Sequence, residues 1–404
     1  MIVITVGMVI GWSFIFFFGD QDNDTSDMDE NSNSDLEEVF SEFPFSSEEG
    51  GIPDVDTVSD SLMIAISGKS YFVGPDGNDK NSGTEKSAPF ATIQKAIDLA
   101  QPGDGVVLLE GEYRQRFFSR RDGTESAPIV IRGSRKSVVK GDKEYDRVIE
   151  IRHDHIVLEG FSVDGLTGSS DVEKNYRDKL IYVQGGDERS GVTGLKMRKM
   201  LIENAGGECI RLLYFAEKNE ISYNTIRGCG AFDYIFDGGG KNGEGIYVGT
   251  APEQRDEKKS PTSDPDISRD NWIHHNYIDT QGNECVDIKE DSIENIVEYN
   301  HCTGQKDSES AGLDARGDHN IFRFNKVHGN KGAGIRFGGD DDGHGVNNSA
   351  YNNNIHNNAN GGIKIMRKPQ GKICENIFSE NKKGNLVGEY SEDFENAKSC
   401  SDEK

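Results

Sequence analysis

Residues 282–339 read GNECVDIKEDSIENIVEYNHCTGQKDSESAGLDARGDHNIFRFNKVHGNKGAGIRFGG. Three short segments recur in this stretch: ECVDIKE at 284–290, AGLDARG at 311–317 and AGIRFGG at 333–339. In each segment apolar residues alternate with charged or small ones. Alternation of this kind is typical of a short strand with one buried and one outward face. The three segments therefore predict strands that stack on one another.

An asparagine two residues before an apolar residue recurs along the chain. The positions are Asn224, Asn276, Asn300, Asn325, Asn353 and Asn376. Their spacings are 52, 24, 25, 28 and 23 residues, and the first is two periods with an insertion at 251–270. A second, aliphatic series keeps the same phase, at Ile210, Ile246, Val286, Leu313, Ile335, Ile363 and Leu386. Asparagine suits such a turn because it tolerates left-handed backbone geometry and because stacked copies can hydrogen-bond to one another.

A repeat of about 20 to 50 residues with several strands in each unit is typical of a solenoid. We therefore predict an all-β chain, a right-handed parallel β-helix over residues 66–390, followed by a C-terminal tail at 391–404. Ala96, Ile97 and Ala100 lie at helical spacing and predict a short helix that caps the N-terminal end. The alternative is a sandwich with Gly- and Asn-rich loops, but it does not explain two series that share one phase.

The N-terminal part differs in composition from the rest. Residues 2–18 are uncharged and apolar, so residues 1–18 are predicted to be a signal peptide or a signal anchor. Entry into the secretory pathway is expected, and the protein would be secreted or tethered to a membrane through residues 2–18. Between Gly19 and Asp60 there are 15 acidic residues and no Lys or Arg, so 19–65 is predicted to be a disordered linker.

The chain has 404 residues and a formal net charge of −26, of which the linker supplies −15. Such an acidic protein is not expected to bind nucleic acid, because phosphate contacts need clustered Lys and Arg. The six cysteines show no zinc-type spacing, and both free thiols and one to three disulfides are consistent with their positions. Cys302 falls in an inward slot beside Ile278 and Val327 and is expected in the core, while Cys374 and Cys400 are candidates for a bond.

Charged residues of the recurring segments converge on the outer face. After Val286, Leu313 and Ile335 come Asp287, Asp314 and Arg336, and two residues further on come Lys289, Arg316 and Gly338. Lys364 and Tyr247 extend the row at its two ends. Because stacked strands lie about 4.8 Å apart, equivalent side chains in adjacent coils are neighbours.

Two interpretations of this row are open. The first is a surface ladder of Asp–Lys and Asp–Arg pairs with only a structural role. The second is a site for an anionic sugar, in which Arg316 lowers the pKa of Lys289 towards the range of a general base. Arginine keeps its charge and can hold a carboxylate with two donors. A base and a carboxylate clamp in an open groove are what proton abstraction next to a uronate carboxyl requires.

The three segments together resemble successive coils of the β-helix polysaccharide lyases that include chondroitinase B and the alginate lyases. The segments ATIQKAIDLAQPGDGVVLLEGEY and APIVIRGS are similar to the opening of the same family. The resemblance covers about residues 70–380 in architecture, and its specific part is 284–339.

This resemblance implies a role for several residues. Lys289 matches the family's Brønsted base, Arg316 its second catalytic residue, and Arg336 a substrate-binding arginine. Since a guanidinium hardly deprotonates, we expect Arg316 to stabilise developing charge. The resemblance also implies a calcium ion on Glu284, which would neutralise the uronate carboxylate. The family's second calcium glutamate falls on Gly282 here, and Glu244 on the preceding coil is the candidate to replace it.

The sequence thus predicts an enzyme, a polysaccharide lyase that cleaves a uronate-containing, anionic polysaccharide by β-elimination. The site hypothesis has Lys289 and Arg316 as catalytic residues and calcium on Glu284 and Glu244. Its expected substrate contacts are Arg336, Asp287, Asp314, Lys364 and Tyr247. The alternative is a non-catalytic carbohydrate-binding or cell-surface β-helix, and a glycoside hydrolase or an epimerase is a third candidate. The histidines show no Asp-Pro-His-Asp cluster of the epimerase type.

Two further segments each allow two interpretations. The loop 338–345 contains Asp340, Asp341, Asp342 and His344, which could bind calcium or form a plain acidic loop. The charged segment 254–270 either walls the groove or is a disordered insertion.

Overall fold

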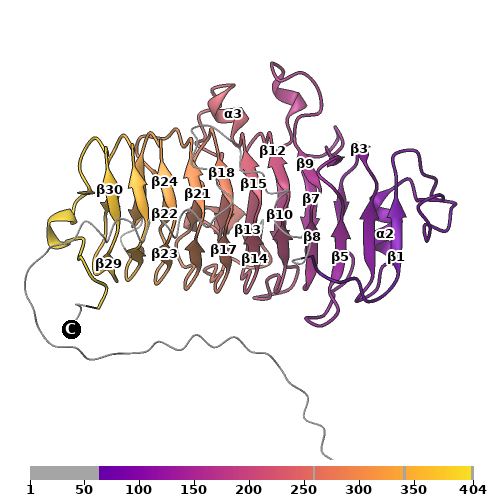
Figure 1. The fold of residues 1–404 in the computed structure, drawn as a ribbon, viewed down its shortest axis with the longest axis horizontal. Coiled ribbons are helices and arrows are strands. Elements are labelled where there is room, and N and C mark those ends of the chain that lie inside the picture. The colour runs from indigo at the N-terminus through magenta and orange to yellow at the C-terminus, as the bar shows by residue number, and fades with distance from the viewer. Residues whose placement is uncertain (1–62, 258–259, 340–342, 402–404) are drawn as a thin grey trace, which may run out of the picture. The chain divides into compact units, whose positions relative to one another are not determined.

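The computed structural model describes residues 63–257, 260–339 and 343–401. At 256–257 only the backbone is described. Three parallel sheets wind around one core, and each turn of the chain adds one strand to each sheet (Figure 1). Two sheets have 10 strands and one has 11 among the described residues. This is the predicted right-handed parallel β-helix. The predicted signal segment 1–18 and linker residues 19–62 lie outside the described residues.

The three sheets are named here A, B and C in the order in which the chain visits them. Sheet A consists of β1 (Ser70–Val73), β2 (Gly105–Leu108), β5 (Ile129–Arg132), β8 (Ile156–Glu159), β11 (Lys196–Arg198), β14 (Glu220–Ser222), β17 (Trp272–His274), β20 (Ile296–Glu298), β23 (Ile321–Arg323), β26 (Ser349–Tyr351) and β29 (Ile373–Cys374). Sheet B consists of β3 (Gly111–Tyr113), β6 (Ser137–Val139), β9 (Ser162–Asp164), β12 (Leu201–Glu203), β15 (Thr225–Arg227), β18 (Tyr277–Asp279), β21 (His301–Thr303), β24 (Lys326–His328), β27 (Asn354–His356) and β30 (Ile377–Ser379). Sheet C consists of β4 (Phe117–Phe118), β7 (Arg147–Ile151), β10 (Lys179–Gln184), β13 (Ile210–Leu213), β16 (Ile246–Val248), β19 (Val286–Ile288), β22 (Ala311–Ala315), β25 (Ala333–Phe337), β28 (Ile363–Ile365) and β31 (Leu386–Val387).

The aliphatic series that the sequence predicted is an in-register column of sheet C. Ile210 pairs with Ile246, Ile246 with Val286, and the column continues without a shift to Leu386. All of its members except the terminal Leu386 are fully buried. Burial of this column fixes the register, because a slip of one residue would turn each apolar side chain outward.

Asparagine side chains link the coils at the turns. In the predicted series, the Asn300 amide donates to the Oδ1 of Asn325 at 3.2 Å, and Asn325 donates to Asn353 at 3.0 Å. Their amides also donate to backbone carbonyls, so buried turn groups are satisfied. The ladder explains why asparagine recurs at this position.

Two more asparagine ladders were missed from the sequence. They comprise Asn219, Asn271, Asn295, Asn320 and Asn348 before sheet A, and Asn330, Asn358 and Asn381 before sheet C. The signal was available, because these asparagines lie five residues before or after members of the predicted series. Asparagines five residues apart therefore mark two corners in most of these coils and all three in the coils of Asn325 and Asn353.

The predicted left-handed backbone geometry belongs to a different residue. The ladder asparagines have negative φ, whereas the residue before each of them is left-handed, as at His275, Tyr299 and Phe324 with φ of 54°. Left-handed non-glycine residues are strained by about 1–3 kcal/mol. Stacking of these rings, with centroids 5.0 and 4.9 Å apart, offsets part of that strain. The left-handed expectation for Asn was therefore wrong, and the hydrogen-bonding expectation was confirmed.

A helix covers the N-terminal end of the coil stack, as predicted. α2 (Ile93–Leu99) follows the N-cap Thr92, whose side chain accepts from the Lys95 amide. Ile93, Ala96 and Ile97 are buried, and the helix lies against β1, β2 and β4 (Figure 1). The other helices of the described residues are short: η3 (Glu173–Asn175), α3 (Ala231–Tyr234), η4 (Pro252–Glu257) and η5 (Ser391–Asp393). In the described part of the chain, no helix is both long and apolar enough to cross a membrane.

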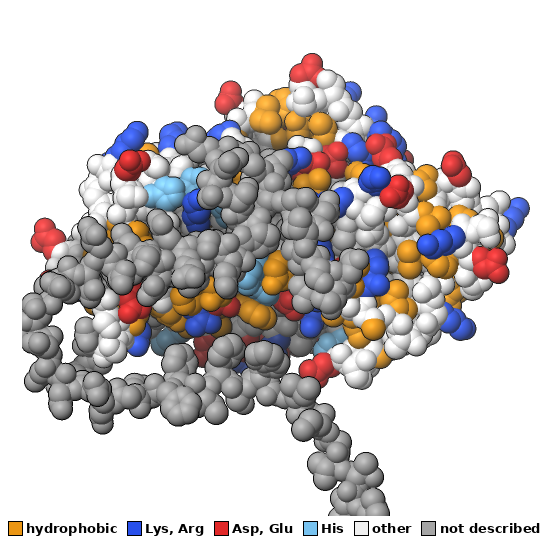
Figure 2. Space-filling view, viewed as in Figure 1, with side chains coloured by type: hydrophobic (Ala, Val, Ile, Leu, Met, Phe, Trp, Pro, Cys, Tyr) orange, Lys and Arg blue, Asp and Glu red, His pale blue; other side chains and the backbone are white. Residues whose placement is uncertain are grey.

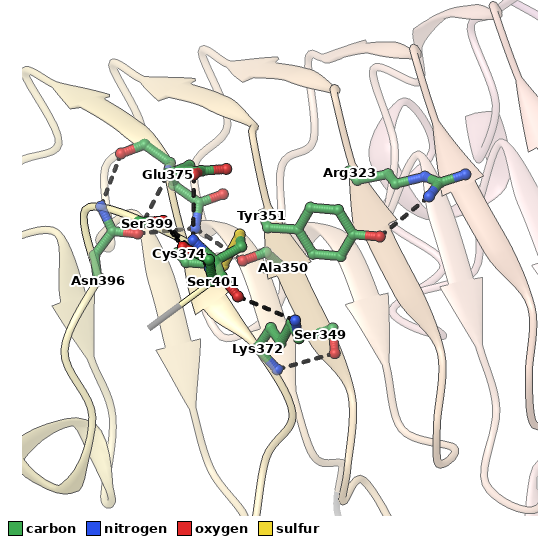
Figure 3. The surroundings of a disulfide bond; sticks show 12 residues. Arg323, Ser349, Ala350, Tyr351, Lys372, Cys374, Glu375, Asn396, Ser399 and Ser401 are labelled. Atoms are coloured by element: carbon green, nitrogen blue, oxygen red, sulfur yellow. Dashed lines mark hydrogen bonds between the residues drawn. A yellow bond between two sulfur atoms is a disulfide. The ribbon is translucent and has the colours of Figure 1, made fainter. Parts of the chain in front are cut away.

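The C-terminal segment closes the other end. Asn396 continues the asparagine ladder, because the Asn376 amide donates to its Oδ1 at 3.0 Å. A disulfide joins Cys374 to Cys400, and Lys372 donates to the Cys400 carbonyl (Figure 3). Residues 391–401, predicted as a tail, thus lie against the last coil.

All six cysteines are paired. Besides Cys374–Cys400, disulfides join Cys209 to Cys229 and Cys285 to Cys302. Cys302 occupies the predicted inward slot between Ile278 and Val327 and is fully buried. Its bond to Cys285 was left open by the sequence, because a core slot and a disulfide partner are compatible.

Charged side chains of both signs are interspersed over the visible face (Figure 2).

The asparagine ladder makes a stability prediction. Asn300→Ala removes donors and acceptors shared with Asn276 and Asn325, and leaves buried partners without hydrogen bonds. We expect a loss of at least about 2 kcal/mol in unfolding free energy, measured by denaturant titration. Asn354→Ala, at a half-buried strand position in sheet B, is the control and should change stability little. Equal effects of the two variants would contradict the ladder's role.

Candidate active site

The charged row lies on the outer face of sheet C, in the predicted register. Tyr247 pairs with Asp287, Asp287 with Asp314, Asp314 with Arg336, and Arg336 with Lys364. Lys289 and Arg316 follow the ends of β19 and β22, and the Arg316 amide donates to the Ile288 carbonyl at 2.8 Å. Parallel pairing therefore brings together the residues that the sequence aligned.

The row is far less exposed than a solvated ladder would be. Asp287 and Asp314 have no exposed surface, and Lys289 and Arg336 are 6% and 7% exposed. The Arg316 side chain is the most open of the central group, at 15%. Buried charges need partners, since taking an ion out of water costs several kcal/mol. Both interpretations from the sequence placed the row at the surface, as a ladder or in an open groove, whereas its central members are buried.

Asp287 is the centre of the ion pairs. The Lys289 Nζ lies 2.5 Å from its Oδ2, and the Arg316 Nε lies 3.6 Å from its Oδ1. The Lys289 ammonium also lies 4.5 Å from the centre of the Tyr247 ring. A cation over an aromatic face is stabilised by the ring's electron density.

Arg336 holds Asp314 in a bidentate pair. Its Nε donates to Oδ1 at 3.0 Å and its Nη2 to Oδ2. Arg316 approaches the same carboxylate, with Nε 3.4 Å from Oδ2. The Lys364 Nζ and the Arg336 Nη1 both donate to the Glu309 carbonyl. Both aspartates thus serve as partners of the cations, and a direct substrate contact by either stays a prediction.

The pKa of Lys289 moves in the opposite direction to the one expected. Burial favours the neutral amine, and Arg316 adds to that effect. Asp287, Tyr247 and Glu244 together outweigh both, so the pKa of Lys289 is raised above its ordinary value. The expectation of a lowered pKa considered only Arg316 and omitted the carboxylate two residues earlier on the same strand.

Three carboxylates form a candidate metal centre. Among the described residues, Glu244, Glu284 and Asp287 are the group in which a carboxylate oxygen from each lies within 4.8 Å of the others. All three are buried. The Glu284 Oε1 accepts from Ser310, while its buried Oε2 has no hydrogen-bond partner. Oxygen-only donors with an unsatisfied buried oxygen suit a hard cation such as calcium.

Glu244 lies beside Glu284, and its replacement of the ligand that the resemblance implies at position 282 stays a prediction. A Cβ at position 282 would lie 2.3 Å from the Cys229 carbonyl oxygen, so no side chain fits there. Glu244 precedes β16, and its Oε2 accepts from the Gly243 amide at 2.9 Å. The structure thus brings together Glu284 and Glu244 as predicted, and it adds Asp287.

Negative charge is in excess around Glu284. Glu244, Asp287, Asp314 and Glu290 are also buried, and three cations, Lys289, Arg316 and Arg336, face these five carboxylates. Burial, with the charges of Asp287, Glu244 and Asp314, raises the pKa of Glu284 to about 8. Burial also raises the pKa of Glu244 and of Glu290. The repulsion among these carboxylates is therefore reduced either by protonation or by a bound cation.

The insertion after β16 covers the upstream part of the row. The Arg211 Nη2 donates to the Gln254 Oε1, and the Tyr247 hydroxyl lies 3.4 Å from the same oxygen. Arg255 forms an ion pair with Asp291. The prediction that this segment walls the site was correct for its described residues.

The sequence interpretation missed Arg211. It follows Ile210 as Asp287 follows Val286, so the same alignment would have placed it in the row. Its guanidinium lies 4.4 Å from the Tyr247 ring centre and donates to Glu208 at 3.0 Å.

In the predicted acidic loop, Asp340, Asp341 and Asp342 lie outside the described residues. His344 lies 3.7 Å from Asp291 and 4.0 Å from Asp318.

Comparisons with known proteins agree with this fold. Residues 305–400 match the family model described as "Right handed beta helix region". The uncharacterized protein YwoF of Bacillus subtilis (strain 168) is 33% identical over 113 residues, which are 26% of this chain and 24% of YwoF. The match thus spans about a quarter of this curated relative.

Two solved structures share most of the architecture. The alginate lyase from Paenibacillus sp. str. FPU-7 superposes with a TM-score of 0.61 and 20% identity, over 74% of this chain and 95% of that one. The pectate lyase Pel9A gives a TM-score of 0.52 and 13% identity, over 81% and 80%. At these identities the likeness establishes the β-helix fold.

The raised pKa of Glu284 makes stability depend on pH. The folded protein keeps a proton on this group that the unfolded chain releases above about pH 4.5, so the associated stability is lost as pH rises towards about 8. In the absence of metal, Glu284→Gln should gain melting temperature relative to the native protein as pH rises from about 5 to 9. Glu253→Gln, at an exposed position, should show no such trend. A constant difference at all pH values would contradict the assignment.

Proposed function

We propose that this β-helix is a polysaccharide lyase that cleaves a uronate-containing polymer by β-elimination. The observation that carries the proposal is the buried pair of Lys289 and Arg316 at the ends of adjacent strands, with Arg336 one coil further on. These three cations face one side of sheet C, and with a divalent cation on Glu244, Glu284 and Asp287 they would suit a substrate with a carboxylate on each sugar. The names of the two similar structures, a lyase of alginate and a lyase of pectate, support a polysaccharide as the substrate class.

The reaction assigns different tasks to the two basic residues. Lys289, as the neutral amine, takes the proton on the carbon next to the uronate carboxyl. The electron pair of that C–H bond forms a carbon–carbon double bond, and the glycosidic oxygen leaves with its bonding pair and takes a proton from solvent. Arg316 stays charged, because its nearby carboxylates raise its pKa although burial opposes this. It therefore stabilises the negative charge that develops on the carboxylate.

Lys289 must lose a proton before it can act as the base. A divalent cation on Glu244, Glu284 and Asp287 would neutralise the charge that now raises the pKa of Lys289, and would also attract the substrate carboxylate. Burial and Arg316 would then favour the neutral amine. The same residues thus explain why activity should depend on a cation.

A non-catalytic carbohydrate-binding protein is the second candidate. It is favoured by the contact of Lys289 with Asp287, which holds the lysine as an ammonium ion in the structure described here. In that case the row would bind an anionic polymer through its cations and would cleave nothing.

The three disulfides support a location on the secretory route. Such bonds persist in oxidising compartments and are rare in the cytosol. Together with the apolar segment 2–18, they support a protein that is secreted or anchored in a membrane. The disulfides are independent of the substrate assignment.

Substitutions of the central pair test the lyase proposal. The native protein, incubated with alginate, pectate and chondroitin with and without calcium, should produce the ultraviolet absorbance of an unsaturated uronate. Lys289→Ala and Arg316→Ala should each lower that rate by about 100-fold or more, since general bases contribute about 10²–10⁴. Lys326→Ala, on sheet B, is the control. Unchanged activity in both site variants would refute the assignment.

Removal of the cation gives an independent result. Chelation should abolish activity, and Glu244→Gln should raise the calcium concentration needed to restore it. Full activity after exhaustive chelation would contradict a role for the three carboxylates.

A further inference from the structure

The row on sheet C is covered on one side of the candidate pair. Upstream of Asp287, its members are Tyr247 on β16, Arg211 on β13 and Tyr182 on β10. They are 2%, 7% and 4% exposed. Tyr182 and Tyr247 join Leu213 and Tyr214 in an apolar cluster outside the main core. This part of the face is therefore filled by the protein itself.

Two insertions flank β16, and the second of them covers the upstream row. Residues 228–245 precede this strand and contain α3, while residues 249–271 follow it and contain η4. In Figure 1, α3 stands out from the stack of coils. The connections after β19, β22 and β28 are shorter, at 289–295, 316–320 and 366–372, while the connection after β25 runs over 338–348, of which 338–339 and 343–348 are described. The two longest of these connections thus flank one strand, β16, immediately upstream of the candidate pair.

Hydrogen bonds fix the second insertion over the row. Gln254 accepts from the Arg211 guanidinium, and the Tyr247 hydroxyl accepts from the Ala251 amide at 3.3 Å. At the base of the insertion, the Thr250 hydroxyl donates to Asp266 Oδ2 at 2.6 Å. Asp266 in turn accepts from the Tyr214 amide, so the cover is anchored to the coil.

In the other direction, the described connections of sheet C are shorter, and the Glu309 carbonyl accepts hydrogen bonds from Arg336 and Lys364. Lys364 on β28 is half-buried, as is Val387 on β31, and their side chains continue the row. Four strand spacings of about 4.8 Å separate β19 from β31, a track of about 19 Å. The row is therefore covered by an insertion towards β13, while its members Lys364 and Val387 become more accessible towards β31.

We propose that the Gln254 segment closes one end of the binding track, so that the protein acts at chain ends and releases short products. This inference rests on the proposed function. An internal sugar of a long chain cannot reach Lys289 while polymer continues on both sides, because Gln254, Tyr247 and Arg211 occupy the upstream positions. A terminal sugar can reach it.

The size of the products tests this inference on the native protein. Absorbance from the unsaturated uronate should rise while the mean length of the remaining polymer, measured by gel filtration, stays near its initial value. A single size class of short product should be present from the first samples. An early fall in mean length with a broad mixture of fragments would overturn the proposal.

A loop variant tests the cause. Replacing residues 252–262 with a short Gly-Ser linker retains Thr250 and Asp266 and should convert the pattern to internal cleavage. Glu253→Ala, at an exposed position of the same segment, is the matched control and should keep the native pattern. An unchanged pattern in the linker variant, with its folding confirmed by circular dichroism, would overturn the assignment to this segment.

Binding separates this inference from the lyase proposal. Partial acid hydrolysis shortens the polymer and so raises the number of chain ends at a fixed mass. In calorimetric titration with the Lys289→Ala variant, the number of binding sites per mass of polymer should rise in proportion to the number of ends. A number of sites independent of chain length would refute end binding. Absence of cleavage by the native protein on every uronate polymer, with end-dependent binding intact, would refute the lyase proposal alone.

Discussion

Stacking of one coil on the next at a fixed strand spacing is the constraint on which this structure depends. Parallel pairing places equivalent residues of successive coils about 4.8 Å apart, so any repeated side chain becomes a continuous column. Apolar columns fill the inside, and asparagine columns satisfy buried turn groups at three corners. The strands can be as short as two or three residues because each is supported by a neighbour above and below.

The same constraint creates the candidate site. Charged residues at equivalent positions of adjacent coils become neighbours, and in the centre of the row on sheet C they are also buried. Each cation compensates a carboxylate of the same or the adjacent strand, as Lys289 does for Asp287 and Arg336 for Asp314. The charge of Glu284 is only partly balanced by nearby cations, and burial together with neighbouring carboxylates raises its pKa. A buried group of this kind adds little to stability, which favours a functional reason for its presence.

The columns of the fold could be predicted from the sequence, because residues at equivalent positions of the repeat become neighbours when the coils stack. The register of Asp287, Asp314, Arg336 and Lys364 follows directly from the aliphatic series. A wall formed by 254–270 was one of two interpretations, but its contacts with Tyr247 and Arg211 could not be predicted, since an insertion has no repeat that fixes its path. The pKa of Lys289 was mispredicted because it depends on the balance of charges from several strands. The disulfide between Cys285 and Cys302 depends on a corner geometry that the spacing of cysteines does not determine.

The bond that is broken in the polymer decides between the three functions considered. A nuclear magnetic resonance spectrum of the purified short product, formed from a uronate polymer by the native protein, tests this directly. The proposal predicts one olefinic proton signal, from an unsaturated terminal uronate, for each glycosidic bond broken. New reducing ends without that signal would identify a hydrolase, and polymer recovered intact would leave a binding protein. Either result would contradict the lyase account.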